Sequence, residues 1–157
     1  MKPLPFSLAL ILIAAQAAAA GDVTTQPTLT LEGAKRVVAA AMAYARSHDA
    51  PGAAVAVVDA GGHTILLERL DGSFPASADV SIGKARTASR FRRESRTFYN
   101  AFETGHAYVS TLEAGIVASP GGFPLVDGGK VIGAIGCSGG TGDQDAAICK
   151  VGADVVK

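Results

Sequence analysis

The chain of 157 residues has 14 basic and 14 acidic side chains, and therefore no formal net charge at neutral pH. Without a global positive field it is a poor partner for nucleic acid, and we exclude that class of ligand. The length suits a single domain with a sizeable hydrophobic core.

The first 20 residues have the composition of a secretory signal peptide. Lys2 supplies a positive charge, residues 6–15 are apolar, and Ala18 to Ala20 form a small-residue cleavage site before Gly21. A retained N-terminal anchor is the alternative interpretation. We expect residues 21–157 to be periplasmic or secreted, with no membrane span after signal cleavage, and residues 21–28 to form a flexible lead-in.

The first half of the remaining chain predicts a helix followed by a hairpin. Thr30 is suited to cap a helix whose apolar residues recur at helical spacing until residues 48–52 end it. Residues 53–60 are continuously apolar, which is typical of a central strand covered on both faces. A Gly61-Gly62 turn then leads into a returning strand over residues 63–70.

The second half predicts two helices, a second hairpin and a last helix. The helices span residues 78–91 and 95–102, and residues 111–118 are either a short strand or irregular. Two apolar runs around Asp127-Gly128-Gly129 predict a hairpin over residues 121–138. The last helix starts near Thr141.

The order of these elements determines the fold class. Neither hairpin can belong to a parallel βαβ unit, so the chain is α+β rather than doubly wound. We predict a five-stranded antiparallel sheet with helices on both faces.

Two cysteines, Cys137 and Cys149, fall on the last strand and the last helix. In an oxidising compartment a disulfide between them would join the helix to the sheet. Two buried free thiols that pack as small hydrophobic groups are the alternative.

A basic cluster is the sharpest local feature of the sequence. Its six members are Lys84, Arg86, Arg90, Arg92, Arg93 and Arg96. On a helix, Arg86, Arg90 and Arg93 share one face, and guanidinium groups bind carboxylates in a bidentate way. The cluster therefore favours a small anionic ligand, whereas a solvated helix face or a subunit contact would explain it without any ligand.

The three histidines give no metal-binding motif of the usual kind. His48 ends a helix, where a cation is favoured by the helix dipole. His63 follows the Gly-Gly turn and is explained by capping it. His106 lies between elements near Tyr108, and either residue is a candidate axial ligand to haem iron, although an ordinary loop looks the same.

Other catalytic patterns are weak. Ser138 is not in a nucleophile elbow, and Asp143 and Asp145 are explained by the N-terminal dipole of the last helix. The small residues Gly121 and Gly122 ahead of Pro124 indicate a loop that forms a cleft beside the second hairpin.

Five short motifs in one order resemble the GlcG/HbpS family, also called haem-binding protein-like. They are residues 56–62 (AVVDAGG), 83–88 (GKARTA), 121–125 (GGFPL), 131–136 (VIGAIG) and 142–145 (GDQD). The resemblance covers residues 29 to about 156 and implies one domain over residues 29–157. It also implies a profilin-like α/β/α fold, assembly into homo-oligomers, and haem as a cofactor in some exported members. A related domain is the C-terminal part of PduO-type corrinoid adenosyltransferases.

The resemblance also suggests ligand-binding residues. Lys84 and Arg86 match the family's Gly-Lys-Ala-Arg helix, while Ser95 departs from it, because Glu94 stands where relatives have proline before a threonine. The full set of candidates is Lys84, Arg86, Arg90, Ser95, Gly121, Gly122, Phe123 and Pro124.

Three functions are consistent with these observations. The first is an exported haem-binding protein that carries, sequesters or helps to sense haem. The second is a cofactor-independent enzyme acting on a small organic acid, in which Lys84 or Arg86 orients a carboxylate and His106 or Asp79 moves a proton. The third is a non-catalytic structural oligomer.

Overall fold

The computed structural model describes residue 22 and residues 24–156, so the expected signal peptide lies outside the described residues. The elements are α1 (Leu31–Ser47), β1 (Ala54–Asp59), β2 (Thr64–Arg69), α2 (Ser77–Phe91), α3 (Arg96–Glu103), the 3₁₀ helix η1 (Ala107–Thr111), β3 (Gly122–Asp127), β4 (Lys130–Ser138) and α4 (Gly142–Ala153). Both hairpins and the four longer helices follow the sequence prediction closely.

The sheet has four antiparallel strands in the order β2-β1-β4-β3. Strand β1 is almost entirely buried and pairs on both sides, as its continuous apolar sequence predicted. The prediction of five strands was wrong for the part of the chain that the structure describes.

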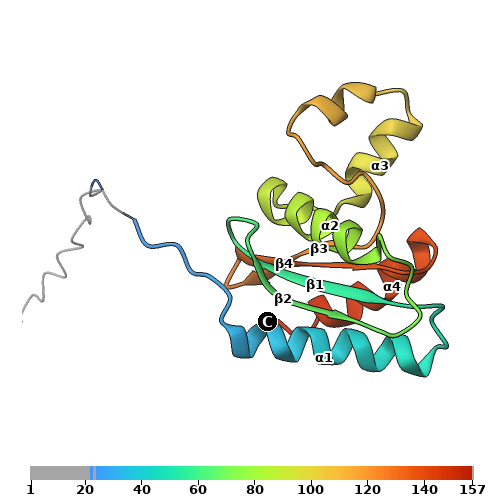
Figure 1. The fold of residues 1–157 in the computed structure, drawn as a ribbon. Coiled ribbons are helices and arrows are strands. Elements are labelled where there is room, and N and C mark those ends of the chain that lie inside the picture. Colours follow the sequence, from blue (N-terminus) through green and yellow to red (C-terminus); the bar gives the residue numbers. More distant parts are fainter. Residues whose placement is uncertain (1–21, 23, 157) are drawn as a thin grey trace, which may run out of the picture.

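The missing fifth strand is the segment before β3. Residues 107–111 form η1, and the Val117 backbone N–H donates to the Thr87 side chain at 3.0 Å. After η1 the chain therefore returns past α2 to β3 rather than along a sheet edge (Figure 1). Its backbone hydrogen-bonds to a helix side chain, and its apolar residues pack on α2 instead of extending the sheet.

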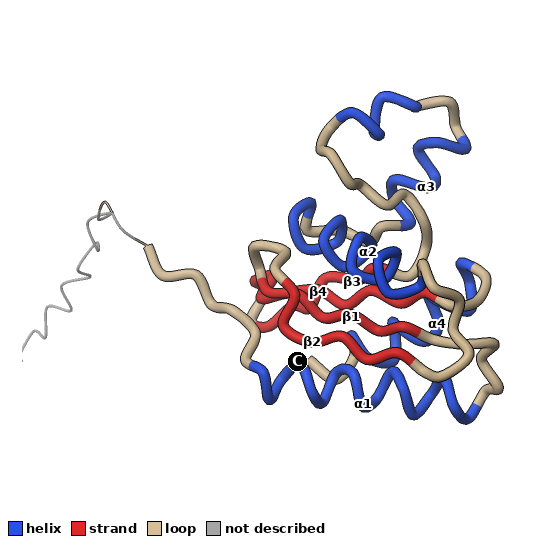
Figure 2. The backbone as a smooth tube through the Cα atoms, in the orientation of Figure 1, coloured by secondary structure: helices blue, strands red, loops and turns tan. Residues whose placement is uncertain are grey.

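Helices cover both faces of the sheet (Figures 1 and 2). Helices α1 and α4 lie on one face, where Val37, Val57, Ile135 and Ile148 belong to the main hydrophobic core. Helix α2 lies on the other face, over a smaller core made of alanine and valine. The α+β class with helices on both faces is thus confirmed.

Small residues bring α2 unusually close to the sheet. A Cβ atom added to Gly136 of β4 would overlap the Ser81 carbonyl and the Ala85 backbone of α2. Glycine is needed at this position because two backbones approach each other directly. This close contact fixes which side chains of α2 face the sheet and which face outward.

Helix α1 shows how the sequence determines its boundaries. The Thr30 side chain accepts a hydrogen bond from the Gly33 backbone N–H at 3.1 Å, which is the predicted N-cap. Its apolar face is buried and its other face is exposed.

None of the helices described by the structure is both long and apolar enough to cross a membrane.

A disulfide joins Cys137 of β4 to Cys149 of α4. Both residues are fully buried in the main core, and their Cα atoms are 5.6 Å apart. The bridge between helix and sheet predicted from the two cysteines is present, and the alternative of two free thiols is wrong.

Candidate functional site

A cavity of about 470 Å³ lies on the outer side of α2. Its walls are α2, the turn between β1 and β2, and residues 113–117. Its polar and charged lining residues are His63, Asp79, Arg86, Thr87, Arg90 and Glu113. The volume lies in the range typical of sites for small organic ligands and cofactors.

Two arginines of α2 are fixed against the β1–β2 turn. The Arg86 Nε atom donates to the Gly62 carbonyl at 3.2 Å, and the Arg90 Nε atom donates to the Gly61 carbonyl at the same distance. Arg90 also forms an ion pair with Glu113. Arg86 has no ion pair with a carboxylate among residues 24–156, so its positive charge remains available to a ligand.

The same turn carries an aspartate and a histidine. Asp59 Oδ1 accepts hydrogen bonds from the backbone N–H groups of Gly61 (2.8 Å) and His63 (2.9 Å), and Asp59 Oδ2 lies 3.3 Å from His63 Nδ1. Partial burial raises the pKa of Asp59, but these hydrogen bonds and the imidazole outweigh burial and leave the pKa below its usual value. Asp59, rather than His63, caps the turn.

Apolar side chains complete the cavity. They come from α2 and from residues 113–117, and they are Ile82, Phe91, Ile116 and Val117. A Cβ atom on Gly83 would overlap the Val117 side chain, so glycine allows the segment to pack directly on α2. The cavity therefore has an apolar wall and a polar rim, on which Arg86 is the arginine without a carboxylate partner among residues 24–156.

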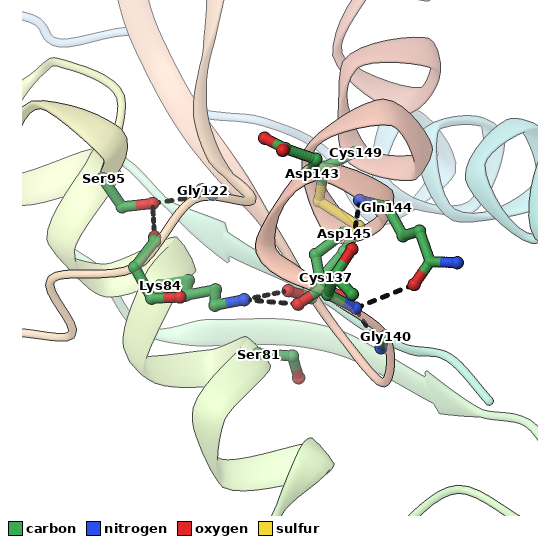
Figure 3. A network of polar contacts seen from close by, with 12 residues as sticks. Ser81, Lys84, Ser95, Gly122, Cys137, Gly140, Asp143, Gln144, Asp145 and Cys149 are labelled. Atoms are coloured by element: carbon green, nitrogen blue, oxygen red, sulfur yellow. Dashed lines mark hydrogen bonds and ion pairs between the residues drawn. A yellow bond between two sulfur atoms is a disulfide. The ribbon is translucent and has the colours of Figure 1, made fainter. Parts of the chain in front are cut away.

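Lys84 lies on the opposite side of α2, facing the sheet, and does not line this cavity. Its Nζ atom donates to Asp145 Oδ2 at 2.7 Å and to the Cys137 carbonyl at 2.9 Å (Figure 3). The side chain of Lys84 is only 1% exposed and that of Asp145 only 4%. Burial lowers the pKa of Lys84, although the hydrogen bond and charge of Asp145 act in the opposite direction.

Asp145 therefore does more than stabilise a helix dipole. Its second oxygen, Oδ1, accepts from the Gly140 backbone N–H at 3.0 Å, and the carboxylate connects α2, β4 and α4. The prediction that the helix dipole alone explains both carboxylates was wrong for Asp145, while the exposed Asp143 lies in the first turn of α4 and pairs with Arg96.

The glycine pair at the start of β3, Gly121 and Gly122, is closely packed against this network. The Ser95 Oγ atom accepts from the Gly122 N–H at 2.8 Å and donates to the Ser119 carbonyl at 2.6 Å (Figure 3). Cβ atoms on Gly121 and Gly122 would meet Asp145 and the Lys84 backbone, respectively. These residues lie in close backbone packing, and Arg86 and Arg90 line a different surface.

The other predicted residues lie elsewhere. Phe123 and Pro124 line a second hollow of about 250 Å³ with residues of α4. His106 and Tyr108 are exposed on the arm formed by α3 and η1, where His106 Nδ1 contacts Thr104 Oγ1 at 3.0 Å. Neither of them lines either cavity. Of the predicted residues, the main cavity brings together Asp79, Arg86 and Arg90.

Comparison with known proteins identifies the family. A model described as "Haem degrading protein HbpS-like" matches residues 29–154. The chain belongs to the HbpS-like family. The relation to GlcG, expected from the five motifs, is also confirmed: the chain is 36% identical to Protein GlcG of Escherichia coli K12 over 114 residues, which are 73% of this chain and 84% of GlcG. It is 38% identical over 130 residues to an uncharacterized 15.0 kDa protein of Citrobacter freundii, covering 81% and 91% of the two chains.

Solved structures of this HbpS-like family share the fold. A double mutant of HbpS from Streptomyces reticuli matches with a TM-score of 0.80 at 28% identity, over 98% of this chain and 99% of that one. The PduOC:Heme complex matches with a TM-score of 0.76 at 24% identity, over 83% and 96% of the two chains. The second likeness shows the fold alone.

Proposed function

We propose that this HbpS-like chain binds haem in the cavity over α2 and acts outside the cytoplasm as a haem carrier, sequestering protein or sensing accessory. The observation that carries this proposal is the combination of an apolar wall with the guanidinium group of Arg86 in one cavity. Haem has the same dual character, because a flat apolar macrocycle carries two carboxylates.

The family supports the proposal. Its model is described as haem-degrading, and a protein of the same fold, PduOC, has a solved complex with heme. When bound, haem supplies an iron centre whose properties depend on the protein ligand and its surroundings. The chain itself would contribute Arg86 to hold a propionate, while Ile82 and Val117 exclude water from the macrocycle.

A hemin titration tests this proposal. The purified protein should give a shifted Soret band that saturates at one equivalent per chain or fewer. Arg86→Ala should weaken binding by about 10-fold, because a charge-assisted hydrogen bond is worth about 1.5 kcal/mol or more. Arg36→Ala, which removes an exposed arginine of α1, is the matched control and should bind like the wild type. A spectrum that never saturates would discard the proposal.

Export rests on the signal-peptide sequence of residues 1–20. Fractionation of the producing cells should place the protein outside the cytoplasm, and N-terminal sequencing should begin near Gly21. Recovery of the protein in the cytoplasm with Met1 and residues 2–20 intact would overturn this part of the proposal.

The second candidate function is a cofactor-independent enzyme for a small organic acid. It is favoured by one observation, that Asp79 and Arg86 line the same cavity while Lys84 and His106 do not. Arg86 would orient a carboxylate and Asp79 would move a proton. Turnover without haem that is lost in both Arg86→Ala and Asp79→Asn would favour this function over the first.

A further inference from the structure

The histidine of the cavity lies on a turn that holds the neighbouring Asp59 carboxylate in place. The Asp59 backbone N–H donates to the His63 carbonyl at 2.9 Å, and the Ser89 hydroxyl of α2 donates to the Asp59 carbonyl at 2.7 Å. Two further backbone N–H groups bind the Asp59 carboxylate. The carboxylate that faces the imidazole is thus fixed to both the sheet and α2.

This arrangement selects one form of the imidazole. When Nδ1 carries the proton and donates it to Asp59 Oδ2, the Nε2 atom has a free lone pair. Nε2 has no hydrogen-bond partner among residues 24–156, and the side chain is 79% exposed where it lines the cavity. Histidines that bind metals commonly donate their other ring N–H to a carboxylate in this way.

A single imidazole is sufficient for haem iron but not for a bare metal ion. In the described part of the chain, no group of three or more histidine, cysteine, aspartate or glutamate residues could hold a metal ion. Haem iron already has four nitrogen ligands from the macrocycle, so the protein needs to supply only an axial ligand. The donor set of the cavity fits this requirement.

The charges around His63 fit the same ligand. The Arg86 side chain binds the carbonyl of Gly62, the residue next to His63, so a cation and the imidazole lie on one rim. Arg90 binds the neighbouring Gly61 carbonyl, but its charge is paired with Glu113. Haem in this cavity would therefore meet the available cation of Arg86 and the available Nε2 atom of His63 on the same rim of the cavity.

From this juxtaposition we propose that His63 is the axial ligand of haem iron in this cavity and that Asp59 positions it. The inference rests on the proposed haem-binding function. It replaces His106 and Tyr108, which the sequence suggested, because those side chains lie on the α3–η1 arm and do not line the cavity.

The test compares His63→Ala with two matched histidine controls, His48→Ala and His106→Ala. Each purified protein is loaded with hemin and examined by absorption, electron paramagnetic resonance and resonance Raman spectroscopy. The wild type and both controls should show an axial imidazole, and His63→Ala should lose that signature. In His63→Gly, added imidazole should restore the wild-type spectrum, which shows that the variant is folded.

A second variant, Asp59→Asn, tests the positioning role. A carboxylate hydrogen bond strengthens the imidazole as a ligand, so the iron–histidine stretching frequency of the ferrous complex should fall in the variant. Hemin affinity should fall by about 10-fold, the lower end of the usual effect of losing such a partner. A purely structural role of Asp59 would not move the stretching frequency.

The outcomes separate this inference from the proposed function. If the wild type binds hemin and His63→Ala keeps the same axial signature, His63 is not the ligand, whereas the haem function survives. If His106→Ala alone loses the signature, the ligand lies on the arm. If the wild type does not bind hemin at all, both proposals fail.

Discussion

At the scale of single residues, Lys84 and Asp145 form a buried ion pair that connects two helices through the end of β4. Taking one charge away leaves the other in a low-dielectric interior, whereas replacing both by apolar groups removes the penalty. The pair has hydrogen bonds to the Cys137 carbonyl and the Gly140 N–H, so most of its polar atoms are satisfied.

Lys84→Met should therefore lower the free energy of unfolding by about 3–5 kcal/mol. The double variant Lys84→Met/Asp145→Leu should recover a large part of that loss, although the Gly140 N–H then lacks its acceptor. Denaturant unfolding of the wild type and the single and double variants measures the difference. A double variant as unstable as the single one would show that the unpaired charge of Asp145 is not the cause of the lost stability.

The same lysine should give stability a particular dependence on pH. Burial lowers the pKa of folded Lys84 below its ordinary value of 10.5. Between the lowered folded pKa and the unfolded value of 10.5, the unfolded chain binds more protons than the folded chain. The free energy of unfolding therefore rises with pH across this window. The gain is lost again as pH falls through the folded pKa of Lys84. The unfolding free energy of the wild type relative to Lys84→Met should rise from neutral pH towards 10.5. A constant difference would contradict a lowered pKa.

For Lys84 and His63, the sequence predicted the local backbone environment, but it did not identify the side chains that they contact. Gly83 and Ala85 indicated that Lys84 lies in a tightly packed part of a helix, but Asp145 is 61 positions away and nothing local connects the two. His63 was explained as a turn cap because Gly61-Gly62 precedes it. The distinguishing signal is Asp59, four residues earlier at the end of a buried strand. From there a carboxylate can reach the imidazole across residues 60–62.

At the scale of elements, the packing of residues 113–117 on α2 forms one wall of the cavity. Gly83 makes that packing possible, since a methyl group there would overlap the Val117 side chain. The contact is with a side chain rather than backbone, so the segment can shift without unfolding the helix.

Gly83→Ala should consequently weaken hemin binding by several-fold, because residues 113–117 must move. The free energy of unfolding should change little, because alanine raises helix propensity by about 0.5–1 kcal/mol and this gain offsets the cost of moving the segment. The control is Gly33→Ala in α1, whose Cβ atom would meet the flexible Leu29 side chain far from the cavity. Equal hemin affinity in the two variants would mean that residues 113–117 do not shape the site.

Elements were predicted well where a local pattern determined them. The N-cap at Thr30, the glycine-containing turns and the continuous apolar run of β1 each specify structure within a few residues. Residues 111–118 have no such pattern, and their conformation depends on Thr87 and on the groove beside Gly83. The position of the cavity depends on that tertiary contact, so it could not be predicted from the sequence.

At the scale of the whole molecule, the α3–η1 arm stands out from the body (Figure 1). Phe98 is the buried residue of α3, and it packs edge-on against Phe91 of α2. Several large apolar side chains of the arm are exposed, namely Tyr99, Phe102, Tyr108 and Leu112. Exposed apolar groups gathered on one projection are typical of a surface that contacts another protein, and the family resemblance suggests a second copy of the chain.

A paired substitution on the arm tests assembly separately from ligand binding. In Tyr108→Ser/Leu112→Ser, two of the most exposed apolar side chains, 61% and 53% exposed, become polar, and neither lines a cavity. The mass of the wild type in solution, measured by light scattering, should be a multiple of the chain mass, and the variant should shift towards the monomer. The free energy of unfolding per chain should change little if the two side chains contribute only to subunit contacts. A wild type that is monomeric at high concentration would exclude the oligomer and therefore also the function as a structural oligomer. The cavity over α2 would then be a site complete within one chain.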